Sequence, residues 1–267
     1  MAFLITVATI LILAGLTSCQ EGTRFALALP PTVEELNTEI IVNARERTTV
    51  TITYPNSTVF EFEVGGGSAL SYVVDTSWKV YHELETLGFY IDADRPITVH
   101  IAAEDWSVIG GQREQPEATI LRPITTDSTE FLIASYSRTR QTTRSPYAFY
   151  MLVANEDDTH VTVYTREDDA MVVDLDVTLQ QHEVYTRDAF HEFDADYPDF
   201  TGDYVNADKP IAVMSGHGMA LNDITEDEVH YRYVMEYIPP IETLGTDYTT
   251  FPTEFGDPSF GYRTRII

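Results

Sequence analysis

The chain has 267 residues, of which 43% are hydrophobic, so it is long enough for one large domain or two of ordinary size. Its 43 acidic residues against 16 Lys and Arg give a formal net charge of −27, which disfavours nucleic acid and anionic membranes as partners. Such acidity is typical of the solvated surface of a secreted protein, although it also attracts cations and basic partners. The 16 Tyr and 13 Phe exclude a disordered acidic tail and favour β-structure.

Residues 1–19 contain no charged residue and end in small residues, which predicts a secretory signal peptide. The usual basic segment is missing at its start, so an uncleaved signal anchor is an alternative. The letters "LTSC" also fit a bacterial lipobox, in which Cys19 would carry lipid. No other window is long and apolar enough to span a bilayer. Because Cys19 is the only cysteine, cleavage after it leaves a mature protein without disulfides.

Residues 20–37 are expected to form an N-terminal arm, and strand-like sequence begins at residue 38. "VFEFEV" at 59–64 alternates with period two, and the "GGG" that follows it predicts a turn or bulge. The sequon "NST" makes Asn56 a candidate glycosylation site in a polar turn. Residues 137–147 are polar and contain several Arg, so we expect a linker loop there.

One short stretch of the chain occurs twice. "ADRPITV" at 93–99 returns as "ADKPIAV" at 207–213, and each copy predicts a turn closed by Asp and then a strand that begins at Pro. Two other segments recur in the same order. The offsets of the three pairs are 111 (159 − 48), 114 (208 − 94) and 117 (240 − 123), a drift expected of a duplicated unit whose loops take insertions.

Each copy contains several short strands and no amphipathic helix, which predicts an all-β fold of two tandem antiparallel β-sandwich-like repeats. A propeller-like β repeat uses a similar number of strands and is the alternative. The predicted repeats span 38–136 and 148–255. Residues 256–267 resemble the start of the second repeat, so we expect them to begin a third one; the alternative is that they complete the second repeat as a strand.

No pattern in the sequence specifies an active site or a cofactor, and we expect neither. "VMSGHGM" places Ser215 and His217 close together, but a nucleophile elbow requires Gly two residues on either side of the Ser. We expect a strand that ends there in a turn of small residues. One acidic loop provides oxygen ligands suited to Ca²⁺, although solvated turn residues are the simpler interpretation. Its carboxylates are Asp194, Asp196, Asp199 and Asp203.

The order of these motifs resembles the N-terminal domain of the IgGFc-binding protein family over residues 38–267. "LVANEDDTHVTVY" opens the second unit, and "ADKPIAV" and "PIETLGTDY" follow it as in that family. The first copy departs from the pattern, with "TTDSTEF" in place of "TLGTDY". If a ligand is recognised, we expect the loops that differ between the copies, 102–117 and 215–232, to bind it.

This resemblance implies a non-enzymatic binding or adhesion module that is secreted or at the cell surface, in mucus, matrix or defence. Extracellular proteins or glycoproteins would be its partners. The alternatives are a secreted hydrolase that uses paired acidic residues and a purely structural extracellular repeat.

Overall fold

The computed structural model describes residues 20–30, 37–104, 108–109, 112–113, 117–135, 148–188, 200–224 and 229–246. The predicted signal peptide, the linker at 137–147 and the predicted third repeat at 256–267 lie outside these ranges. The described residues form antiparallel strands and two short 3-10 helices, η1 (Thr76–Trp78) and η2 (Ile241–Thr243), so the prediction of an all-β fold is confirmed. No helix in this part of the chain is long and apolar enough to cross a membrane.

The first unit is organised around one long strand, β7 (Phe89–Glu104), which has 16 residues. The first half of β7 pairs with β1 and β3, and its second half pairs with β2 and β10. The other strands are β1 (Gly22–Leu27), β2 (Asn37–Ala44), β3 (Thr48–Thr53), β4 (Val59–Val64), β5 (Ser68–Val74), β6 (Leu84–Thr86), β8 (Val108–Ile109), β9 (Gln112–Arg113) and β10 (Glu117–Ile120). Residues 20–37, expected as an arm, therefore contain a strand of the sheet.

The second unit repeats this pairing with separate strands. Strand β16 lies between β11 and β13, and β17 lies between β12 and β18. Strands β13 and β14 pair in turn, as do β12 and β15. Its strands are β11 (Glu130–Leu132), β12 (Ala148–Ala154), β13 (Thr159–Glu167), β14 (Ala170–Leu179), β15 (Glu183–Asp188), β16 (Tyr204–Ala207), β17 (Ile211–Ile224) and β18 (Val229–Tyr237).

The two units therefore match strand for strand. The order β1–β7–β3–β4 corresponds to β11–β16–β13–β14, and β10–β7–β2–β5 corresponds to β18–β17–β12–β15. Hydrogen bonds beyond the strands repeat as well. The N–H of Leu121 donates to the carbonyl of Val99 at 2.8 Å, and the N–H of Ile238 donates to that of Val213 at 2.9 Å.

The repeated Asp–Pro motif behaves differently in the two copies. In the second copy the predicted turn is present, because residues 208–210 separate β16 from β17. In the first copy the prediction of a turn is wrong, since β7 continues through Asp94 to Pro96. Here the N–H of Arg95 donates to Oγ1 of Thr48 at 3.0 Å, and its guanidinium pairs with Glu46. These contacts keep the segment against the neighbouring strand.

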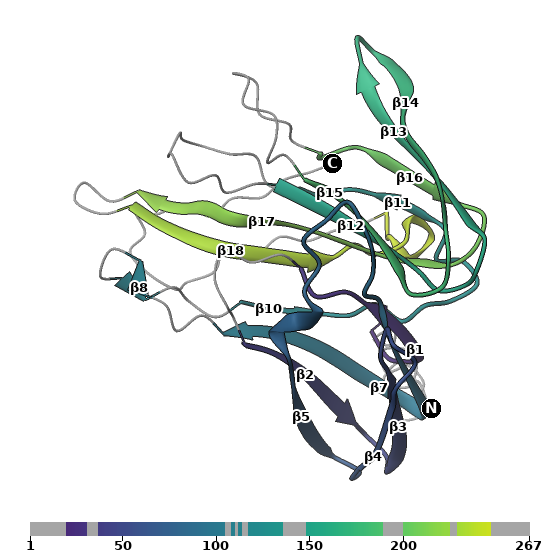
Figure 1. Ribbon diagram of the computed structural model, residues 1–267, viewed down its shortest axis with the longest axis vertical. Coiled ribbons are helices and arrows are strands. Elements are labelled where there is room, and N and C mark those ends of the chain that lie inside the picture. The colour runs from purple at the N-terminus through teal and green to yellow at the C-terminus, as the bar shows by residue number, and fades with distance from the viewer. Residues whose placement is uncertain are drawn as a thin grey trace, which may run out of the picture.

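The sheet that contains β12 forms the middle layer of the molecule (Figure 1). All seven residues of β12 are buried, so both of its faces are covered. Phe149, Met151 and Val153 belong to the core shared with the first unit, whereas Tyr150 and Leu152 belong to the core of the second. The two units are thus stacked in layers on a shared sheet, which favours the sandwich over the propeller.

One buried tyrosine joins the two units. Tyr90, on β7, is 5% exposed, and its hydroxyl donates to the carbonyl of Ala154 at 2.5 Å. The same oxygen accepts the N–H of His182 at 2.7 Å. Next to it, Gly88 donates its N–H to the carbonyl of His182 at 2.8 Å, and β6 extends the middle sheet by pairing with β15. This contact places the first unit in a fixed orientation on the second.

Candidate functional site

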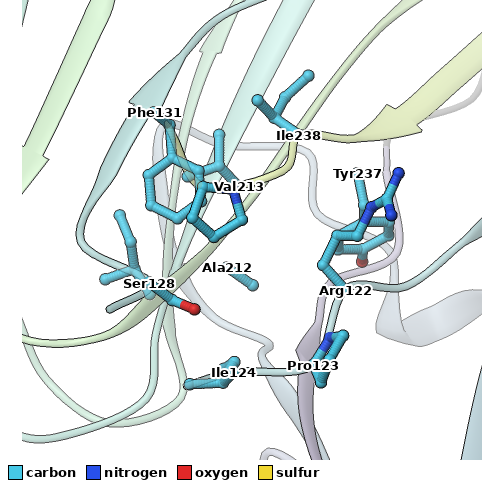
Figure 2. A pocket seen from close by; sticks show the side chains of 11 residues that line it. Arg122, Pro123, Ile124, Ser128, Phe131, Ala212, Val213, Tyr237 and Ile238 are labelled. Carbon is cyan, nitrogen blue, oxygen red and sulfur yellow. The ribbon is translucent and has the colours of Figure 1, made fainter. Parts of the chain in front are cut away.

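A small pocket lies where the connection between the units meets the middle sheet (Figure 2). Its cavity volume is about 10 Å³, room for about one water molecule, and its lining includes Pro123, Phe131, Tyr237 and Pro240. Ser128 also lines it, and its hydroxyl accepts the N–H of Thr125 at 3.0 Å. Pockets for organic ligands usually enclose about 300 Å³ or more. The pocket is therefore better explained as part of the junction than as a ligand site.

Ser215 and His217 do not form a catalytic pair at a surface. Both are 1% exposed, and the hydroxyl of Ser215 donates to the carbonyl of Phe149 at 2.9 Å. The expected turn is absent, because β17 continues to Ile224. The sequence also predicts small residues in this segment, and position 216 does require one. A Cβ on Gly216 would lie 2.2 Å from the carbonyl oxygen of Val234, so only Gly fits between the strands.

The predicted acidic loop is only partly described. Asp194, Asp196 and Asp199 lie outside the described residues, whereas Asp203 is 6% exposed and its carbonyl accepts the N–H of Ile133 at 2.9 Å. Among the described residues, no three His, Cys, Asp or Glu side chains converge in a way that could hold a metal ion. Calcium binding by this loop stays a prediction.

Asp208, in the second copy of the repeated motif, lies in the predicted turn, but its side chain bonds the neighbouring strand β13 and is not shown to close its own turn. Its Oδ1 accepts the N–H of His160 at 2.8 Å. The neighbouring Lys209 donates from Nζ to the carbonyls of Asp157 and Asp158 at 2.5 and 3.1 Å. These side chains hold the loop before β13 against the turn before β17, so the motif stabilises the fold at this place.

Asn56 lies in an exposed turn between β3 and β4. Its side-chain oxygen accepts the N–H of Thr58 at 3.0 Å, which closes the turn, and Ser57 between them has a φ of 63°. The whole sequon is exposed on the outside of the molecule, as an enzyme that attaches glycans requires.

The most prominent exposed feature of the second unit is the hairpin formed by β13 and β14, which projects from the body (Figure 1). Its turn residues, Asp168 and Asp169, have φ values of 44° and 69°, as in the tight turns that suit two-residue hairpins. Strand β14 lies at the edge of its sheet and exposes Met171 and Val173, which are 52% and 56% exposed. Exposed apolar side chains on a sheet edge are typical of contacts with other proteins.

Acidic side chains surround this apolar edge. Asp169 pairs with Arg166 at 2.9 Å, and Asp176 pairs with His160 at 2.6 Å. Asp174 lies 3.5 Å from Arg187. With Asp168 also in the turn, the hairpin combines an apolar strip with a negatively charged rim, and a partner with basic side chains at its own rim would complement it.

This hairpin is not among the binding segments expected from the sequence, which are the loops at 102–117 and 215–232. The structure places 215–224 in β17 and 229–232 in β18, so most of the second range is strand and not loop. Residues 105–107, 110–111, 114–116 and 225–228 lie outside the described residues, and ligand binding by either range is not tested. A signal for the hairpin is present in "REDDAMVVD", where two Asp lie between strand-like segments and the following strand carries Met and Val among acidic residues. The sequence cannot show that this strand has no neighbour on its outer edge among the residues that the structure describes.

The described residues thus form a layered β repeat whose second unit carries an exposed apolar hairpin. The chain belongs to the IgGFc binding protein family, whose model matches residues 117–267, more than half of the sequence. The match includes β10 and the whole second unit. Comparisons with curated proteins and with solved structures find no match. The resemblance inferred from the repeated motifs is therefore confirmed for residues 117–267, whereas residues 38–116 lie outside the match.

Proposed function

We propose that this chain is a non-enzymatic binding or adhesion module that acts outside the cell, in mucus, matrix or defence. The observation that carries the proposal is membership of the IgGFc binding protein family. Its partners are extracellular proteins or glycoproteins. Residues 1–19 direct secretion in this proposal, and the acidic surface keeps the secreted chain soluble. A glycan on Asn56 belongs to the same proposal.

The β13–β14 hairpin is the part of the molecule that we propose to contact the partner. It lies within the residues that match the family, and it exposes Met171 and Val173 on an unpaired strand edge. Desolvation of a small apolar centre supplies most of the free energy in protein interfaces, and the charged rim contributes to orientation and association rate. The family description makes the Fc part of immunoglobulin G the first partner to test.

The first unit offers a matched control for this test. Val59 on β4 corresponds to Val173 on β14 (173 − 59 = 114), and the two side chains are 58% and 56% exposed. Val59 lies outside the residues that match the family. The variants Val173→Asp and Val59→Asp thus place the same charge on equivalent, equally exposed strand edges.

Binding of the chain to immobilised Fc is measured by surface plasmon resonance for the wild type and both variants. We expect Val173→Asp to weaken binding by about tenfold or more, since a charge would be desolvated in the contact, and Val59→Asp to leave it unchanged. Equal effects of the two variants would exclude the hairpin as the contact. If Fc does not bind, the same pair of variants is used to capture proteins from native mucus or matrix. Equal capture by wild type and Val173→Asp would exclude the hairpin as the contact, and no specific capture by the wild type would leave the purely structural repeat as the function.

A further inference from the structure

Strands β1 and β11 occupy the same place in the two units but differ in burial. From Phe25 to Leu29, in and after β1, five consecutive side chains are all buried. In and after β11, Phe131 and Ile133 are buried, whereas Leu132 is partly exposed and Ala134 is exposed. Strand β1 is covered on both sides because the second unit packs against it. The outer side of β11 has no such cover among the described residues.

The tyrosine that joins the units has a counterpart on this open side. Tyr204 corresponds to Tyr90 (204 − 90 = 114). Each lies at the beginning of its strand, β16 or β7, and the repeated Asp–Pro motif follows it in the sequence. Tyr90 is buried against the second unit, whereas Tyr204 is only partly buried and packs beside Tyr164 at a ring distance of 6.0 Å. The second unit thus keeps the anchor residue of the interface, and within the described ranges nothing covers it as the second unit covers Tyr90.

The neighbouring glycine repeats the same difference. A Cβ on Gly88 would lie 3.1 Å from both the Cγ1 of Val153 and the carbonyl oxygen of His182, because the second unit approaches closely there. Gly202 is its counterpart (202 − 88 = 114), and no described atom lies within 4 Å of the place where its Cβ would be. The close approach that the first unit makes at Gly88 is therefore open at Gly202.

The chain leaves both units by the same route. Segments "GTRF" at 22–25 and "STEF" at 128–131 begin the two units, and "GTDY" at 245–248 follows the second unit at the corresponding place (245 − 128 = 117). The first residue of the first two segments, Gly22 or Ser128, lies near a proline. A Cβ on Gly22 would lie 2.2 Å from the Cβ of Pro123, and Ser128 lines one pocket with Pro240. Ser128 is 2% exposed, but Gly245 is exposed.

The opposite ends of the two units differ in polarity. The second unit packs onto the first with Phe149, Met151 and Val153 of β12. Ala44 pairs with Ile97 and Ala154 pairs with Ile211, which are corresponding residues of the repeated motif. The residues of β2 that correspond to these three residues of β12 are therefore Glu39, Ile41 and Asn43. Two of these three are hydrophilic, which suits the terminal unit of an array, where a polar outer face is required. The first unit therefore suits one end of a stack of such units, and the side on which a further unit could pack is at β11.

We propose that the outer side of β11 and β16, defined by Leu132, Ala134 and Tyr204, is the docking surface for a third unit of the same fold that the chain enters at Gly245. The third unit packs onto the second as the second packs onto the first, and Tyr204 takes the bridging role of Tyr90. The β13–β14 hairpin stays free in this arrangement. Its counterpart in the first unit keeps Val59 and Phe60 58% and 38% exposed while the second unit is docked.

The test compares the protein isolated from its natural source with the 267-residue chain by hydroxyl-radical footprinting and mass spectrometry. In the 267-residue chain we expect Tyr204 to be labelled more than the buried Tyr90 and less than Tyr81, which is 53% exposed. In the natural protein we expect the labelling of Tyr204 to fall to that of Tyr90, while Tyr81 is unchanged.

Two outcomes would overturn this proposal. One is a natural protein that contains no residues beyond 267, and the other is a longer protein in which Tyr204 remains as reactive as in the 267-residue chain. Neither readout involves a binding partner, so the result is separate from the test of the β13–β14 hairpin.

Discussion

The variant Tyr90→Phe removes one oxygen from the interface between the units and leaves the ring in place. That oxygen donates to the carbonyl of Ala154 at 2.5 Å and accepts the N–H of His182 at 2.7 Å. Ala154 is fully buried, so its carbonyl loses a partner that water cannot replace, whereas His182 is only partly buried and can regain part of its hydrogen bonding from solvent. A buried polar group left without a partner costs about 1–3 kcal/mol. We expect Tyr90→Phe to lower the free energy of unfolding by about 2–3 kcal/mol.

The matched control is Tyr204→Phe, at the corresponding position of the second unit. The hydroxyl of Tyr204 has a 3.3 Å contact with the side-chain nitrogen of Asn206, and the residue is partly exposed. We expect a loss of less than about 0.5 kcal/mol, as for most surface changes.

Both variants are measured by urea denaturation followed by the fluorescence of Trp78, which packs against Phe89 at a ring distance of 5.9 Å. A loss for Tyr90→Phe no larger than that for Tyr204→Phe would refute the assignment of Tyr90 as the residue that joins the units.

Three further predictions follow from single contacts. Burial and the nearby Glu83, which accepts the hydroxyl of Tyr185 at 3.0 Å, raise the pKa of Tyr185 to about 12. The fold favours the protonated form, so this stabilisation is complete below the ordinary pKa of about 10 and is lost between there and about pH 12; melting temperatures should fall in that window, and less steeply for Tyr185→Phe. Gly216→Ala should destabilise by about 3 kcal/mol or more in urea, because its Cβ would lie 2.2 Å from the carbonyl oxygen of Val234. Gly65→Ala, which meets only the Ser68 hydroxyl at 3.1 Å, is its control and should lose less than about 1 kcal/mol. In a host that glycosylates, Asn56→Gln should remove the mass of one glycan, and an unchanged mass would show that the sequon is unused.

The sequence predicts the strands better than it predicts their neighbours. Alternation at 59–64 and the glycines that follow it correctly place β4 and the turn before β5, because both depend on local side-chain chemistry. The repeated Asp–Pro motif correctly places the start of β17 but not the course of β7. In β7 the contacts of Arg95 are with Thr48 at the start of β3 and with Glu46 in the loop before it, and no local pattern contains them.

The candidate hairpin illustrates the same limit. The alternation in β14 indicates a strand with Met171 and Val173 on one side, but it does not show whether another strand or sheet covers that side. In β12 a similarly apolar sequence is buried on both faces, because a second layer packs on each. Whether an apolar side chain is core or contact surface is decided by the packing of distant segments, and this is the information that a single sequence lacks.

Because β12 is covered on both faces, cutting the chain between the two units would expose apolar side chains. A fragment that begins at residue 117, where the family match begins, keeps the second unit but strips Phe149, Met151 and Val153 of the layer that hides them. Such a fragment would present a wide apolar sheet to water and would associate or aggregate. The smallest soluble portion of the chain therefore contains both units, because a fragment with only one of them has only part of the core that they share.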